Sequence, residues 1–134
     1  MIMKRQHQLL FRGLLRIVLA AAAVAVIGAC RTVPSDISED KTAAQLFQMA
    51  QEAVDNDNFG AALAYYEAVY DRFGDDPETS TIALYEIGFV HYRQGRNDEA
   101  RPYFERVTER YENGESGLPE WPLVLSRRFL ERMS

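Results

Sequence analysis

The sequence contains an internal repeat with a spacing of 38 residues. When the chain is aligned with itself at this offset, NFGAALAYYEAVYDRF (58–73) lies over RNDEARPYFERVTERY (96–111). The identical pairs are Ala62 and Ala100, Tyr65 and Tyr103, Glu67 and Glu105, Val69 and Val107, and Arg72 and Arg110. A repeat of this period indicates a fold in which each unit buries its apolar side against its neighbour.

Each unit predicts two helices joined by a tight turn, because apolar residues follow helical spacing on both sides of the polar segments 55–58 and 94–97. Asp76 and Pro77 predict the N-cap and first residue of a third helix. A last amphipathic helix is expected from about Pro119 to Met133, where it would cover the open side of the second unit. The predicted fold is all-α: a short right-handed α-solenoid of two helix-turn-helix repeats plus a C-terminal capping helix.

The second unit resembles a tetratricopeptide repeat. The residues that fall near the consensus positions of that family are Leu84, Gly88, Tyr92, Gly95, Ala100, Phe104 and Val107. The units are longer than the usual 34 residues, and the first ends in Asp76-Pro77. Similar stretched units occur in the outer-membrane assembly lipoprotein and periplasmic cell-division coordinator families. The resemblance implies a protein-binding module whose first helices line a concave groove.

The first thirty residues predict a secretory signal. Four basic residues and no acid precede a run of thirteen uncharged residues, 17–29. As a helix this run would span about 20 Å, against about 30 Å for a bilayer core. The stretch IGAC (27–30) resembles the lipobox of bacterial lipoproteins, which implies cleavage before Cys30 and attachment of lipid, such as palmitate, to that residue. An uncleaved anchor, or a plain signal peptide with a coincidental cysteine, stays open.

These features divide the chain into a signal peptide (1–29), a lipidated Cys30 with a polar tether (30–40) and a helical domain (41–134). Cys30 is the only cysteine, so no intramolecular disulfide can form. Arg31, and not the Asp that retains enteric lipoproteins in the inner membrane, follows it. In a cell with two membranes this favours the outer one, with the domain facing the periplasm.

The charge balance argues against nucleic-acid binding. All 20 acids follow Cys30, but only 11 of the 15 Lys and Arg residues do, so the mature chain carries a net charge of 11 − 20 = −9. Such a surface repels phosphate backbones and anionic head groups. Contact with the membrane is therefore expected to come from the lipid on Cys30.

The segment DNDNFG (55–60) has some features of a calcium loop, but Phe59 and Tyr66 stand where an EF-hand requires oxygen ligands. The repeat favours an inter-helix turn here, and neither a metal site nor a cofactor is expected. An enzyme is not expected either. The mature chain has one histidine, His91, and its paired acids lie at predicted caps and turns, where they offset helix dipoles.

The inner face of the solenoid is the candidate binding surface that the resemblance implies. The residues carried over to it are Phe47, Gln51, Tyr85, Phe89, Tyr92 and Arg93. Aromatic residues and arginine are enriched in binding hot spots. The same aromatic stripe would also suit a core covered by the terminal helix, and the sequence leaves both interpretations open.

We therefore expect a lipid-anchored, periplasm-facing adaptor that binds a protein segment in cell-envelope assembly or maintenance. Two alternatives belong to other classes. One is a structural subunit that associates with itself or with a larger envelope complex, and the other is a carrier of a small ligand or metal.

Overall fold

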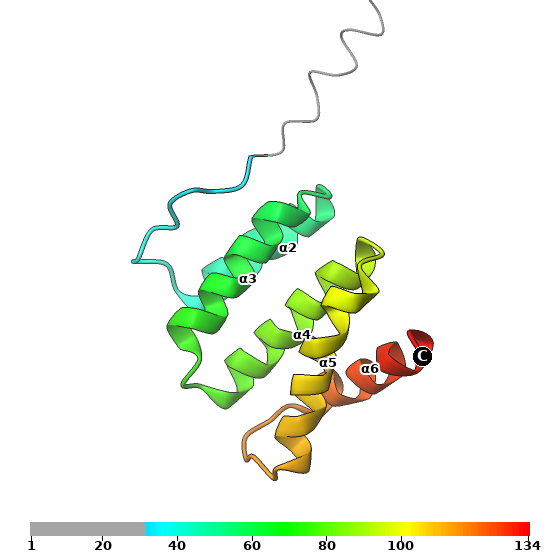
Figure 1. Ribbon diagram of the computed structural model, residues 1–134. Coiled ribbons are helices and arrows are strands. Elements are labelled where there is room, and N and C mark those ends of the chain that lie inside the picture. The colour runs from blue at the N-terminus through cyan, green and yellow to red at the C-terminus, as the bar shows by residue number, and fades with distance from the viewer. Residues whose placement is uncertain (1–31) are drawn as a thin grey trace, which may run out of the picture. The chain divides into compact units, whose positions relative to one another are not determined.

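The computed structural model describes residues 32–134, and every regular element in that part of the chain is a helix (Figure 1). The elements are α2 (Ala43–Asp55), α3 (Phe59–Phe73), α4 (Pro77–Arg93), α5 (Asn97–Glu112) and α6 (Glu120–Arg132). None of these helices is long and apolar enough to cross a bilayer. The predicted signal peptide and Cys30 lie outside the described residues.

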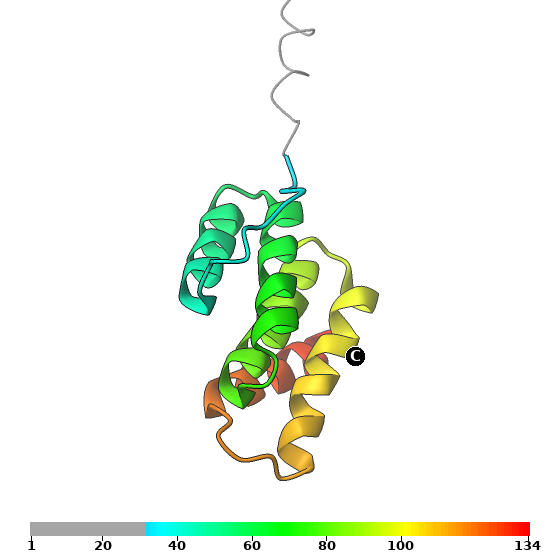
Figure 2. The same ribbon diagram turned by 90° about the vertical axis from the view of Figure 1, so that its left-hand side faces the viewer.

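The helices pack in chain order as two antiparallel pairs and a fifth helix. The α2–α3 pair and the α4–α5 pair form the two units, α3 packs on α4, and α6 packs mainly on α5 (Figures 1 and 2). This arrangement confirms the predicted all-α helical-repeat fold.

The two turns of the units adopt equivalent backbone conformations. Asp57 has a φ of 52° and Gly95, 38 positions later, has a φ of 72°. Both lie in the left-handed region that Gly, Asn and Asp tolerate best. The side chain of Asn58 then caps α3 by accepting from the amide of Ala61. The segment DNDNFG (55–60) therefore contains an inter-helix turn at 56–58. Residues 32–134 contain no group of three or more His, Cys, Asp or Glu side chains that could hold a metal ion.

Helices α4 and α5 approach each other closely at Gly88. A Cβ atom added at Gly88 would come within 3.0 Å of the Tyr103 Cβ and 3.1 Å of the Phe104 ring. Phe104 and Ala100 are fully buried beside it. The glycine predicted at this consensus position is thus required for the approach of the two helices, since interiors are close-packed and tolerate little added volume.

Residues 32–42 form a non-helical segment, the N-terminal strap, which lies over the α2–α3 pair (Figure 2). The Asn58 side-chain amide donates to the Thr32 carbonyl at 3.1 Å. The Arg72 guanidinium donates to the Ile37 carbonyl at 2.6 Å. The composition of this segment predicts a polar tether, but these contacts hold its residues against the helices.

Enlarging Gly88 should destabilise the domain by overpacking the α4–α5 contact. We expect Gly88→Val to lower the free energy of unfolding by about 1–3 kcal/mol, measured by urea denaturation followed by circular dichroism. Ala44→Val, at an exposed position of α2, is the control and should change stability by less than about 0.7 kcal/mol, the helix-propensity cost. Equal losses in the two variants would show that the close approach at Gly88 is unimportant.

Candidate functional site on the inner face

One side of α4 stays partly exposed along the central and C-terminal turns of the helix. Ile82, Glu86, Phe89 and Arg93 are incompletely buried, whereas the other positions between 83 and 91 are buried. Their spacings of four, three and four residues place them on one face of the helix. This stripe is the α4 part of the inner face of the solenoid.

The same stripe recurs on α2. Ala44, Gln48, Gln51 and Asp55 lie 38 residues before the four α4 residues, and all of them are exposed. Equivalent positions of the first helix in both units are thus accessible. The inner face is defined below by these two stripes and by the matching residues of α6.

Helix α6 takes the place of the first helix of a third unit. Its buried residues Pro122, Ser126 and Phe129 each lie 39 positions after buried Ala83, Ile87 and Val90 of α4. The same offset carries the α4 stripe to positions 121, 125, 128 and 132. Among these, the Trp121 side chain is 40% exposed and its ring meets the Tyr85 ring edge-on at 5.0 Å between centroids.

The α6 helix covers two of the aromatic residues predicted to bind a partner. Tyr85 is only 6% exposed, and its ring contacts those of Phe104 at 5.9 Å and Phe129 at 6.5 Å. Tyr92 lies 4.6 Å from the Phe129 ring. Of the two interpretations that the sequence leaves open, the core interpretation describes Tyr85, and Tyr92 is half-buried against the same helix.

The other four predicted binding residues keep accessible surface. Gln51 is exposed, and Phe47 is half-buried, with its ring 6.0 Å from the Tyr66 ring. Phe89 is half-buried and stacks on Tyr85 at 6.1 Å. Their role in binding stays a prediction.

Arg93 already has intramolecular partners. Its guanidinium lies 3.4 Å from a carboxylate oxygen of Asp57 and 5.2 Å from the centre of the Phe59 ring. The first of these contacts joins the α2–α3 turn to the end of α4. Arg93 therefore contributes to the packing of the two units as well as to the inner face.

Glu86 carries the strongest electrostatic perturbation on this face. Burial raises the pKa of its carboxyl group to about 7, although hydrogen bonding with the Tyr66 hydroxyl lowers it. Burial and the charge of Glu86 in turn raise the pKa of Tyr66. Burial disfavours the charged form of the Glu86 carboxyl group, and a positive charge nearby would stabilise that form again. This position therefore favours a cationic group opposite Glu86.

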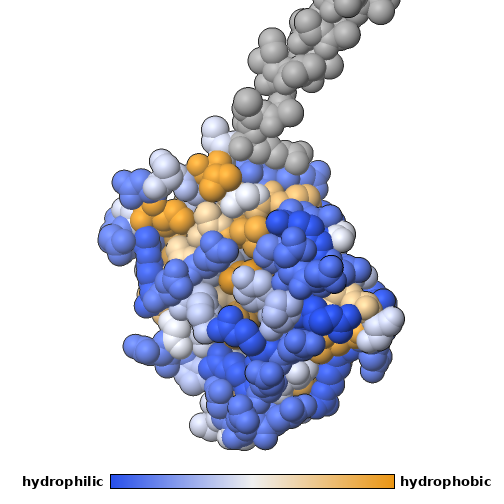
Figure 3. Space-filling model, viewed as in Figure 1, coloured by the Kyte–Doolittle hydropathy of each residue, from blue (hydrophilic) through white to orange (hydrophobic). Residues whose placement is uncertain are grey.

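Two hollows in the surface of residues 32–134 are not lined by inner-face residues. One of about 330 Å³ is lined by residues from α3, α4 and α5, including Tyr70, Ser80, Arg106 and Arg110. Another of about 320 Å³ lies beside the strap. In the view of Figure 3, the surface is hydrophilic over most of its lower half, and apolar residues gather near the strap. The inner face is thus distinct from both of these hollows.

His91 has a structural environment. It is buried between α4 and α5, and its ring stacks on the Tyr103 ring at 5.5 Å with an interplanar angle of 14°. Burial and the neighbouring charge of Arg96 lower its pKa. The neutral imidazole is therefore part of the core, and no nucleophile accompanies it in these contacts.

The sequence did not single out Glu86 or Trp121. Glu86 could have been found from its place in the stripe with Ile82 and Phe89 at helical spacing. Trp121 could not be found in this way, because the equivalent positions of α2 and α4 are 38 residues apart, whereas those of α4 and α6 are 39 residues apart. The exposed Val124, also on α6, was missed for the same reason.

The comparisons with known proteins agree with this architecture. A model of the tetratricopeptide repeat family matches residues 47–115, about half of the chain. The chain therefore belongs to the tetratricopeptide repeat family, whose units generally bind proteins and are not catalytic.

A protein of Treponema pallidum (strain Nichols), described as an uncharacterized protein, is 30% identical over 103 residues. The match covers 75% of this chain and 41% of that protein, so the chain spans about two fifths of the length of this relative. No solved structure matches the chain significantly.

Neutralising Glu86 should stabilise the domain at alkaline pH. Its pKa is raised in the folded state to about 7 from an ordinary 4.5, so the folded state holds a proton that the unfolded state has lost, and stability falls as pH rises across this window. We expect Glu86→Gln to gain about 1–3 kcal/mol at pH 8 and much less at pH 4.5, measured by urea denaturation. Glu105→Gln, at an exposed position of α5, is the control. A gain that is equal at both pH values would contradict the assignment.

Proposed function

We propose that this protein is a lipid-anchored adaptor whose inner face binds a segment of another protein. The observation that carries the proposal is the accessible stripe that recurs on α2 and α4 and continues, at an offset of 39 residues, on α6. A surface of this kind runs across successive units and suits an extended or helical segment.

The chemistry of the inner face favours a partner with both apolar and charged side chains. Phe89 and Trp121 offer partly exposed aromatic rings, of the kind that anchors interfaces. Asp55 and Glu86 offer carboxylates on α2 and α4, and Arg128 adds a cation on α6. A partner segment with a basic residue opposite Glu86 would neutralise a half-buried charge and gain specificity from it.

The anchor is the second half of the proposal. The basic start of the chain, its short apolar run and IGAC (27–30) support lipidation at Cys30. Arg31 and the acidic mature chain support an outer-membrane protein that faces the periplasm and serves envelope assembly or maintenance. Confinement to the membrane would raise the effective concentration of the domain towards partners there.

Photocrosslinking in the native cell envelope tests this function. A photoreactive residue at exposed Gln51 should give a discrete protein adduct, identified by mass spectrometry. The same probe at Glu105, which is exposed on α5, should not give it. Cys30→Ser should shift the protein from the membrane fraction to the soluble fraction and reduce the yield of the adduct. Identical adducts from both probe sites, or adducts only within the chain, would rule out binding at the inner face.

A structural, self-associating role is a second candidate, and one observation favours it. Val124 of α6 is 54% exposed, and Leu123 and Leu130 are only half-buried. Analytical ultracentrifugation should then show a mass that rises with concentration, and Val124→Glu should abolish the rise. A constant monomer mass would remove this candidate.

A further inference from the structure

The strap begins at the turn between α2 and α3. The Thr32 carbonyl accepts a hydrogen bond from the Asn58 side chain at 3.1 Å. Val33 lies so close to the start of α3 that a Cβ atom added at Gly60 would come within 2.7 Å of its Cγ2. The first residues of the described chain are thus fixed at one end of the helix pair.

The strap then runs to the opposite end of α3. Near the end of that helix, Arg72 donates to the carbonyls of Ile37 at 2.6 Å and Ser38 at 2.8 Å, and it pairs with Glu39 at 3.4 Å. The Ile37 side chain packs on a buried cluster that includes Leu46. Residues 32–39 therefore run along α3 from its start to near its end, and these contacts hold them against the domain.

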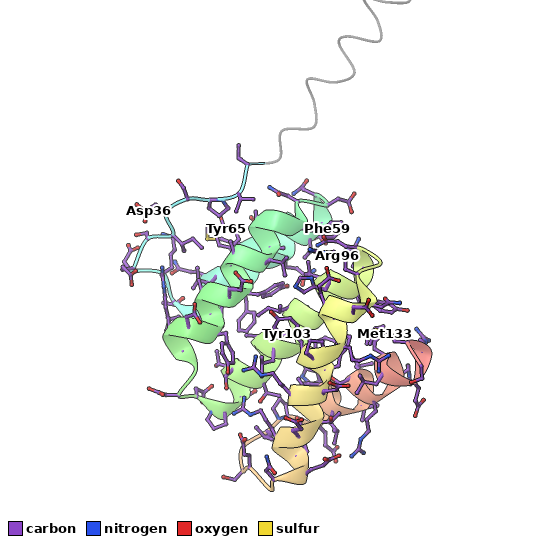
Figure 4. The ribbon with its side chains drawn as sticks, viewed as in Figure 1. Asp36, Phe59, Tyr65, Arg96, Tyr103 and Met133 are labelled. Atoms are coloured by element: carbon purple, nitrogen blue, oxygen red, sulfur yellow. The ribbon has the colours of Figure 1, made fainter. Side chains whose placement is uncertain are left out.

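The end of the domain at Thr32 also carries the turn of the second unit and the end of α6. The α4–α5 turn is joined to the α2–α3 turn by the contacts of Arg93 with Asp57 and Phe59. Arg101, in α5, donates to the Met133 carbonyl at 2.7 Å. Figure 1 shows both turns at the same end of the helices, and Figure 4 shows Phe59 and Arg96 at that end. These segments, 56–58, 94–96 and Met133, are called the near end.

We propose that the strap makes the near end the membrane-facing surface of the domain. The inference rests on the proposed lipidation of Cys30, which precedes Thr32 by two residues. Two residues of chain span at most about 7 Å, whereas a free tether from Cys30 to Asp40 would span up to about 35 Å. The strap therefore holds the α2–α3 turn close to the lipid head groups and points the opposite end into the aqueous space.

The charge of the chain disfavours direct contact of the domain with an anionic bilayer. With a net charge of −9 after Cys30, the domain as a whole is repelled by anionic head groups, which leaves the strap to set its orientation. The inner face, which runs along the helices of both units, is then accessible from the side. A partner that is itself at the membrane could reach it.

Helix α5 offers a matched pair of probe sites. Asn97 is its first residue, at the near end, and Asn113 is its C-cap, at the opposite end; both are exposed. Its 16 residues separate the two sites by about 24 Å. The full chain, processed by the cell, would carry a fluorescent amino acid at one of these sites and be reconstituted into phosphatidylethanolamine–phosphatidylglycerol vesicles that contain a head-group nitroxide lipid. We expect several-fold stronger quenching at residue 97 than at residue 113. Equal quenching, or stronger quenching at residue 113, would overturn the proposal.

Releasing the strap should remove this difference. Asn58→Asp deletes the donor to the Thr32 carbonyl but keeps the side-chain oxygen that caps α3. Combined with Arg72→Ala, which deletes the donor to the Ile37 and Ser38 carbonyls, it should make the quenching at the two sites similar. Arg101→Ala, which loses a bond to the Met133 carbonyl but leaves the strap intact, is the matched control and should keep the difference. A difference that survives in the double variant would show that the strap does not set the orientation.

A failure of the anchor can be told from a failure of the strap. If the chain does not float with the vesicles, the proposed lipidation is wrong. Coupling the free Cys30 thiol to a maleimide lipid then tests the geometry without the native modification. Stronger quenching at residue 97 in the coupled protein would still support the inference, and equal quenching would overturn it.

Discussion

The contact of α4 and α5 at Gly88 is the constraint on which the rest of the second unit depends. Because no side chain separates the helices there, Phe104 can lie against the α4 backbone, where it is fully buried. The Phe104 ring then stacks on that of Phe129 at 5.2 Å and meets that of Tyr85 at 5.9 Å. The seat of α6 is therefore built by the same residue that fills the space beside the glycine, so helix pairing and the closing of the solenoid are coupled.

Two titratable groups in α4 make opposite contributions to stability. Burial raises the pKa of Glu86, so this residue destabilises the folded state increasingly as pH rises from about 4.5 to about 7. Burial and the charge of Arg96 lower the pKa of His91. This residue therefore destabilises the folded state increasingly as pH falls below 6.5, the ordinary pKa of histidine. The two effects oppose one another in mildly acidic solution. His91 lies in a helix–helix contact, whereas Glu86 lies on a face that a partner could cover, so only the cost of Glu86 could be relieved by binding.

The sequence predicted the features that depend on local rules, and it could not resolve those that depend on packing between distant segments. The repeat, the turns at Asp57 and Gly95, and the cap at Asp76 follow from residue type and spacing, and all three were predicted. The aromatic stripe was ambiguous because a groove and a core select the same side chains. Only the contact of Phe129 with Tyr85 and Tyr92 decides that these two residues face α6.

The strap was beyond prediction for a different reason. Its bonds to Arg72 and Asn58 are made by backbone carbonyls, which every residue has, so no pattern in residues 32–42 marks them.

The two ends of the solenoid are closed by interactions of different strength. Helix α6 closes one end with buried aromatic contacts, each of which adds about 0.5–1.5 kcal/mol beyond its buried area. The strap crosses the other end chiefly through hydrogen bonds at partly exposed sites, which contribute about 1 kcal/mol each. Local opening is therefore expected at the strap before α6. In the proposed lipid-anchored protein, full opening of the strap would allow the chain from Cys30 to Asp40 to span up to about 35 Å. Asn58 and Arg72, which hold the two parts of the strap, would then together control how far the domain reaches from the membrane while the inner face stays intact.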